Sequence, residues 1–80
     1  MDDTEILRSI NALVDEEHHL LTEAERGGLS EEQHERLRAA QTQLDQCWDL
    51  LRQRRARREF GQNPDDAKVR DANTVEHYKA

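Results

Sequence analysis

The chain has 80 residues, of which 34% are hydrophobic and 38% are charged, and its net charge is −6 at pH 7. A chain of this size forms one small domain with little room for a large core. The negative charge argues against a general nucleic-acid binder, which is usually basic. The apolar runs are too short for a membrane-spanning helix, and the acidic start MDDTEIL does not resemble a signal peptide. A single cysteine, Cys47, excludes an intramolecular disulfide, so we expect a cytoplasmic protein.

The first helix is predicted over about residues 3–26. Asp2 and Glu5 have the spacing of a capping box, and acidic residues suit the positive end of a helix. Gly27 and Gly28 are expected to end the helix, because glycine readily adopts the left-handed conformation of a C-cap. At 100° per residue, one side of this helix collects eight apolar residues. These are Ile6, Leu7, Ile10, Leu13, Val14, Leu20, Leu21 and Ala24.

The second helix is predicted over about residues 30–60. Ser30 and Gln33 form a second capping-box pattern, and Gly61 with Pro64 should stop the helix. Its apolar residues have the spacing of a coiled-coil seam. They are Leu37, Ala40, Leu44, Cys47, Trp48 and Leu51. A connection of a few residues between two such helices predicts an antiparallel hairpin over residues 1–61.

The turn also predicts which residues of the two helices face each other. If the apex lies near residues 27 and 28, the numbers of facing residues add to roughly 55 to 57. The acidic start of the first helix, Asp2 and Asp3, then lies next to the arginine-rich end of the second. We call this the open end of the hairpin, and the nearest arginines there are Arg54 and Arg55.

The tail, residues 62–80, differs in composition and is predicted to be partly ordered. Asn63 and Pro64 are suited to cap and begin a short helix from about residue 64. Two alternatives remain for the rest: a mobile tail, or a tail that folds back over the open end near Trp48. In the second alternative the covering residues are Val69, Val75 and Tyr78.

The arginines of the second helix are the main candidate for an interaction surface. Residues 1–35 carry eleven acidic and two basic residues, a net −9, whereas residues 36–58 have a net charge of +5. A folded hairpin therefore neutralises much of the basic charge within the chain, and Arg55 and Arg58 are placed to meet the acidic first turn. Docking on an acidic protein and binding of nucleic acid remain alternatives. The candidate surface consists of Trp48, Arg52, Arg54, Arg55, Arg57 and Arg58.

Two Glu-x-x-His patterns, at Glu16 with His19 and at Glu31 with His34, have the spacing used in di-iron helical bundles. Glu16 and His19 fall well away from the apolar side, whereas such ligands must point into the core. A solvated charged surface is the favoured interpretation. Glu17 is different because it falls within the apolar side, so we expect it to contact a polar residue, to remain hydrated, or to contact a second chain.

The remaining polar patterns give no catalytic site. Cys47 is expected to be a packed, unreactive thiol, and Trp48 to be part of the core with one exposed face. The sequence contains no phosphate-binding glycine loop, no nucleophile with its base, and no zinc-binding spacing. We therefore expect neither an enzyme nor a bound cofactor or metal.

Three segments together resemble a known family. The run from ILRSINALVDEEHHL through LDQCWDLLRQRRARRE to NPDDAKVR is similar to the domain of unknown function 2630 family of short bacterial proteins. The resemblance covers nearly the whole chain. It implies an uncharacterised cytoplasmic protein and supports the hairpin, and it assigns no activity, cofactor or site residue.

The sequence thus predicts an all-α, coiled-coil-like antiparallel hairpin with a partly ordered tail. About a dozen large apolar residues are few for two long helices, so we expect self-association, most simply as a dimer that forms a four-helix bundle. The predicted function is a non-enzymatic module for protein–protein interaction or self-assembly. The alternative is a nucleic-acid or ribosome-associated accessory protein that uses the arginines.

Overall fold

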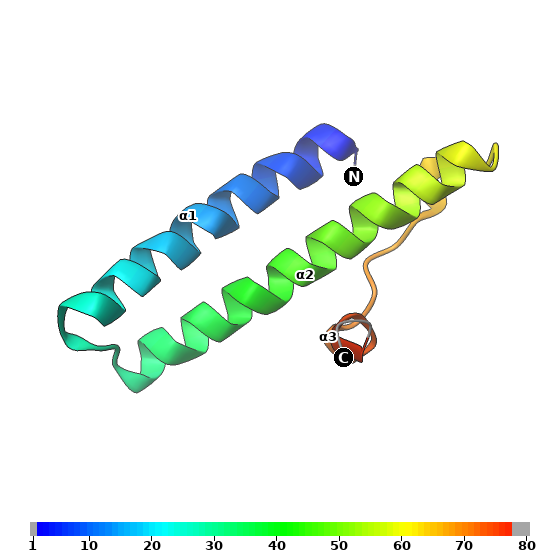
Figure 1. Cartoon of the computed structure of the whole chain (residues 1–80). Helices are drawn as coiled ribbons and strands as arrows, with labels where there is room; N and C mark the ends of the chain where they lie inside the picture. The colour runs from blue at the N-terminus through cyan, green and yellow to red at the C-terminus, as the bar shows by residue number, and fades with distance from the viewer. Residues whose placement is uncertain (1, 78–80) are drawn as a thin grey trace.

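The fold is a pair of long antiparallel helices, with the tail returning along the second (Figure 1). The computed structural model describes residues 2–77, in which α1 spans Asp3–Gly27 and α2 spans Glu31–Glu59. A 3-10 turn, η1 (Pro64–Asp66), and a short helix, α3 (Ala72–His77), follow. No strand occurs among the described residues. The prediction of an all-α hairpin of two long helices is therefore confirmed.

Both long helices begin at capping boxes. The Asp2 carboxylate accepts a hydrogen bond from the Glu5 amide at 2.8 Å, and the Glu5 carboxylate accepts one from the Asp2 amide at 3.2 Å. Ser30 and Gln33 repeat the arrangement at the start of α2. Gly28 ends α1 with φ of 88°, a left-handed value that favours glycine. These local signals explain why the two helices begin and end within a residue or two of the predicted positions.

The hydrophobic core lies between α1 and α2, and the tail adds to it. One buried cluster consists of Ile6, Ile10, Leu44 and Leu50, with Leu13, Cys47, Leu51 and Ala67 partly buried against it; Leu20, Ala40 and Val75 are also buried. Burial of each large apolar side chain contributes about 1.5–3 kcal/mol. Because Ala67 belongs to the tail, α2 is held between α1 and the tail.

An ion pair at the open end shows the register of the hairpin. Arg54 Nε donates to Asp3 Oδ1 at 2.6 Å, and the two residue numbers add to 57, within the predicted range. This alignment also gives the apolar residues that face each other along the two helices, because the numbers of residues that lie opposite each other in antiparallel helices have a constant sum.

The tail reverses direction after α2 and runs back along the side of α2 that faces away from α1 (Figure 1). Gly61, with φ of 71°, makes the reversal, and the Gln62 amide donates to the Arg57 carbonyl at 2.7 Å. Asn63 caps η1 by accepting from the Asp65 amide at 3.0 Å.

Only part of the fold-back alternative agrees with this path. Val75 is buried, whereas Val69 remains 60% exposed and Trp48 45% exposed. Within residues 2–77 the tail covers a different side of α2, because its polar contacts are with that side. Tyr78, the third residue expected to cover Trp48, lies outside the described residues.

Candidate functional site

The predicted apolar side of α1 is buried along one half and exposed along the other. Ile6, Ile10 and Leu20 are buried, but Leu7, Val14 and Leu21 keep 44–46% of their surface exposed. The three exposed residues are spaced by seven, so they follow one another along a single line, about 60–100° around the helix from Ile6. We call Leu7, Val14 and Leu21 the α1 strip.

Trp48 lies on the same face of the hairpin as the α1 strip. It is rotated about 40° around α2 from the buried Leu44. In an antiparallel pair the two helices turn in opposite senses when viewed from one end, so both rotations lead to the same face. A hollow of about 420 Å³ lies between the two helices beside Trp48 and is lined by Glu17 of α1 and by Gln41, Leu44, Asp45 and Trp48 of α2. We call the α1 strip together with Trp48 the Trp48 face.

Trp48 separates this hollow from a basic one. A second hollow, of about 310 Å³, lies towards the open end and is lined by Asp3, Trp48, Leu51, Arg52, Arg55 and Arg58. Neither Arg52 nor Arg55 forms an ion pair within residues 2–77. The Trp48 face therefore combines exposed apolar side chains with two arginines that form no ion pair in the described residues, although the charge of Arg52 helps to lower the pKa of Asp49.

Arg54 is not part of this surface, although it belongs to the predicted set. It is 5% exposed, and besides its bond to Asp3 its guanidinium donates to Asp65 Oδ1 at 3.0 Å and to the Pro64 carbonyl at 3.1 Å. Its bonds to Asp3 and to Asp65 raise the pKa of Arg54, so it remains charged. Arg54 thus joins α1, α2 and η1 at the open end.

The other arginines divide between pairing and exposure. Arg58 donates to Asp3 Oδ2 at 2.8 Å. Hydrogen bonds from Arg58 and Arg54 lower the pKa of Asp3. The acidic first turn is therefore bound by Arg54 and Arg58, which lie one turn apart, and Arg55 projects into the basic hollow instead. Arg57 is half-buried on another side of α2.

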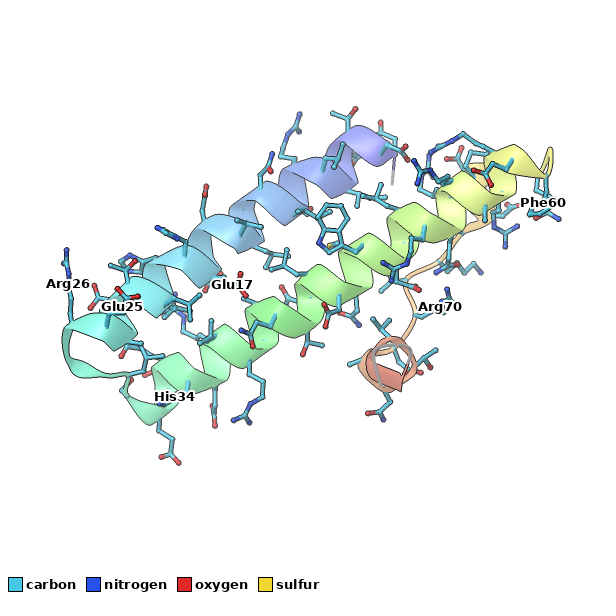
Figure 2. All side chains as sticks on the ribbon, viewed as in Figure 1. Glu17, Glu25, Arg26, His34, Phe60 and Arg70 are labelled. Carbon is cyan, nitrogen blue, oxygen red and sulfur yellow. The ribbon has the colours of Figure 1, made fainter. Side chains whose placement is uncertain are left out.

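A second polar cluster, which the sequence interpretation missed, fixes the tail to α2. Asp49 is 1% exposed, and the Arg70 guanidinium donates to both of its carboxylate oxygens, at 2.7 and 2.9 Å. Gln53 Nε2 donates to Asp49 at 2.9 Å and to the Lys68 carbonyl at 2.9 Å. Gln46 Nε2 donates to the Arg70 carbonyl at 3.1 Å. We call these five residues the tail clamp; Figure 2 labels Arg70, one of its two residues on the tail.

The environment of Asp49 keeps it ionised. Desolvation by burial raises its pKa, but hydrogen bonds from Arg70 and Gln53 outweigh this effect, so that the pKa of Asp49 is lowered overall. A buried carboxylate with a bidentate arginine is a structural contact between two elements. The only sequence signal was the spacing of Gln46, Asp49 and Gln53 along one polar side of α2, which looks the same as a solvated surface.

Glu17 and Cys47 lie near the Trp48 face without forming a reactive site. Glu17 is half-buried and lines the hollow together with Gln41. Its carboxylate makes no hydrogen bond or ion pair within residues 2–77. Burial raises the pKa of the Cys47 thiol, which disfavours the reactive thiolate. The hollow therefore holds a carboxylate in need of water or of a partner.

The Glu-x-x-His residues lie apart on the surface. Glu16 forms an ion pair with Arg36 at 3.2 Å, and His19 and His34 are exposed. No group of three or more His, Cys, Asp or Glu side chains that could hold a metal ion occurs in residues 2–77. In the same part of the chain, no helix is long and apolar enough to cross a membrane.

Comparison with known proteins identifies relatives along almost the whole chain. The family model described as Protein of unknown function (DUF2630) matches residues 2–80. Uncharacterized proteins of Mycobacterium tuberculosis and of Mycobacterium bovis are each 51% identical over 77 residues, which cover 95% of this chain and 88% of the relative. No solved structure matches. The resemblance that the sequence motifs indicated is confirmed.

Proposed function

This chain belongs to the family described as Protein of unknown function (DUF2630), and we propose that it is a non-enzymatic helical interaction module that assembles with a second copy through the Trp48 face. The observation that carries the proposal is the exposure of Leu7, Val14, Leu21 and Trp48, four large apolar residues at 44–46% on one face. Contiguous apolar surface of this kind marks interaction sites in soluble proteins.

The small core supports the same proposal. Fully buried large side chains are few for helices of 25 and 29 residues, and small single domains are marginally stable on such cores. Pairing two hairpins through their apolar faces gives a four-helix bundle and removes the exposed surface from water.

The use of the buried charges supports a structural role. Asp49 and Arg54 are the buried charged residues in the described part of the chain, and each joins two or three elements through ion pairs. The proposal assigns the assembly to the cytoplasm, in keeping with the single cysteine.

Sedimentation equilibrium tests the proposal. The wild type is expected to form dimers, whereas the triple variant Leu7→Gln, Val14→Gln, Leu21→Gln should remain monomeric with unchanged helical circular dichroism. Val69→Gln is the matched control, because Val69 is also exposed but lies on the tail. A wild type that stays monomeric at millimolar concentration would refute self-assembly.

Nucleic-acid binding is the second candidate, and the basic hollow is the observation that favours it. Arg52 and Arg55 remain without an ion pair within residues 2–77, next to an exposed Trp48 on which a base could stack. If this candidate is correct, single-stranded or duplex nucleic acid should bind at low salt and dissociate steeply as salt rises. Failure of both to bind at low salt excludes it.

A further inference from the structure

The apolar part of the Trp48 face is distributed unequally between the two helices. The α1 strip supplies three of its four large apolar residues. On α2 the residues around Trp48 that line the two hollows are the polar Gln41, Asp45, Arg52 and Arg55, together with the buried Leu44 and the partly buried Leu51. A partner that buries this face must therefore offer apolar side chains to α1 and polar ones to α2.

A second copy can meet the face in two symmetric ways. In a head-to-head pair the two-fold axis runs along the helices, so α1 of one copy lies on α2 of the other. The α1 strip would then lie against the polar residues of α2. In a head-to-tail pair, by which we mean an antiparallel one, the two-fold axis runs across the helices. In that pair α1 lies on α1 and α2 lies on α2. The head-to-tail pair is therefore favoured, because it places the two apolar α1 strips against each other.

The spacing of the α1 strip fits such an axis. Leu7 and Leu21 lie about 10 Å on either side of Val14 along α1. An axis at the level of Val14 therefore places Val14 against its own copy and Leu7 against Leu21 of the second copy. Val14 is also close to the middle of α1, Asp3–Gly27, so the two hairpins overlap along nearly their whole length.

The charges at the two ends of the hairpin are complementary in this arrangement. The open end presents Arg52 and Arg55, about 14 and 18 Å from the level of Val14. The turn end of α2 presents Glu31, about 18 Å away on the opposite side, whereas Glu25, which Figure 2 shows at this end, belongs to α1. Because α2 lies on α2, a head-to-tail pair sets Arg55 of each copy over Glu31 of the other, at both ends.

The outline of the hairpin is slightly smaller than the surface that each partner buries in a specific dimer. The hairpin face is about 37 Å long and about 20 Å wide, on the order of 700 Å². Specific interfaces bury about 800 Å² on each partner. The face approaches this size without any contribution from the tail.

We infer that two copies of this chain pair head to tail about a two-fold axis at Val14, with the α1 strips in contact and Arg55 of each copy over Glu31 of the other. The inference rests on the proposed self-assembly, and it adds the orientation and the residues that determine it. Electrostatic complementarity of this kind sets the orientation and the rate of association more than the affinity.

Disulfide crosslinking tests the orientation. In a Cys47→Ser background, Val14→Cys should give a crosslinked dimer under a mild oxidant, because its two copies meet at the axis. Leu7→Cys alone should not, since its two copies lie about 20 Å apart, beyond the reach of a disulfide. A mixture of Leu7→Cys with Leu21→Cys should crosslink. Leu7→Cys crosslinking as readily as Val14→Cys would overturn the orientation.

Charge reversal tests the end contacts separately. The variant Arg55→Glu should raise the dimer dissociation constant about tenfold at low salt, and much less at high salt. Adding the variant Glu31→Lys should restore pairing as a mixed dimer. Arg57→Glu, on another side of α2, is the matched control. A dimeric wild type that tolerates both reversals refutes the pairing of the ends but leaves self-assembly standing, whereas a monomeric wild type refutes both.

Discussion

Removing the arginine of the tail clamp separates the contribution of the tail from that of the hairpin. Arg70→Ala deletes the guanidinium that donates to both oxygens of Asp49, at 2.7 and 2.9 Å. If Asp49 then stayed buried, the loss would be that of a broken buried ion pair, about 3–5 kcal/mol.

The tail can lift, however, and this limits the loss. Arg70 lies on the tail itself, with its side chain 37% exposed, so its removal allows water to reach Asp49. The loss then equals the free energy of docking the tail. That energy comes from the Arg70–Asp49 ion pair, from two side-chain-to-carbonyl bonds of about 1 kcal/mol each and from burial of Val75, about 2 kcal/mol. It is opposed by the desolvation of the ion pair and by the entropy of ordering the segment. We expect a decrease in unfolding free energy of about 2 kcal/mol.

Hydrogen exchange measures the release of the tail, and urea unfolding measures the decrease in unfolding free energy. The Val75 amide, which donates to the Asp71 carbonyl at 3.2 Å, should lose protection in Arg70→Ala, while amides in the middle of α2 keep most of theirs. Lys68→Ala is the matched control, because its exposed side chain is outside the clamp and only its carbonyl is used. A loss above about 4 kcal/mol with the Val75 amide still protected would refute the argument that the tail lifts.

Three further predictions concern the hairpin and the acid range. Ser30→Ala removes the oxygen that accepts from the Gln33 amide at 3.1 Å, and urea unfolding should show a loss of about 1 kcal/mol. Arg54→Ala should lower the melting temperature by more than about 5 °C, whereas Arg55→Ala, on the exposed face, should change it little. Because the pKa values of Asp3 and Asp49 are lowered in the folded state, the unfolded chain binds more protons in acid. Stability should be intact above the ordinary aspartate pKa of about 3.9 and should fall as pH drops further, as urea midpoints between neutral and acidic pH would show.

The hairpin could be predicted because its signals are short in sequence. A capping box joins residues three apart, as in Asp2 with Glu5, and Gly28 ends α1 through its own backbone conformation. The register followed from the length of the turn, and the contact of Asp3 with Arg54 agrees with it. Each of these features depends on neighbours that the sequence displays directly.

The positions of the arginines could be predicted only in part. Segment charges indicated that the acidic start of α1 would meet the basic end of α2. Which arginines would do so depends on the rotation of α2 about its own axis. Arg54 and Arg55 are adjacent and therefore point about 100° apart around the helix. Burial of Arg54 also needs Asp65 and the Pro64 carbonyl, which come from a tail whose path was not predicted.

The tail clamp could not be predicted from the sequence, because its residues on α2 and on the tail lie far apart along the chain. Asp49 and Arg70 are 21 residues apart, and the side of α2 that carries Asp49 and Gln53 has the polar composition of a solvated surface. The sequence therefore left two alternatives for the tail, a mobile segment or apolar packing near Trp48. In the structure, polar groups with fixed geometry determine the position of the tail.

The tail clamp also keeps the tail away from the Trp48 face. To cover Trp48, the tail would have to leave Asp49, and a carboxylate that is 1% exposed would lose its counter-charge. The clamp thus holds the tail on one side of α2 while α1 occupies another. The side with Trp48 is left open, next to a strip of apolar residues on α1 that no described part of the chain covers. Since the tail's own polar contacts keep it away, burial of this face requires another molecule, which we propose to be a second copy of the same chain.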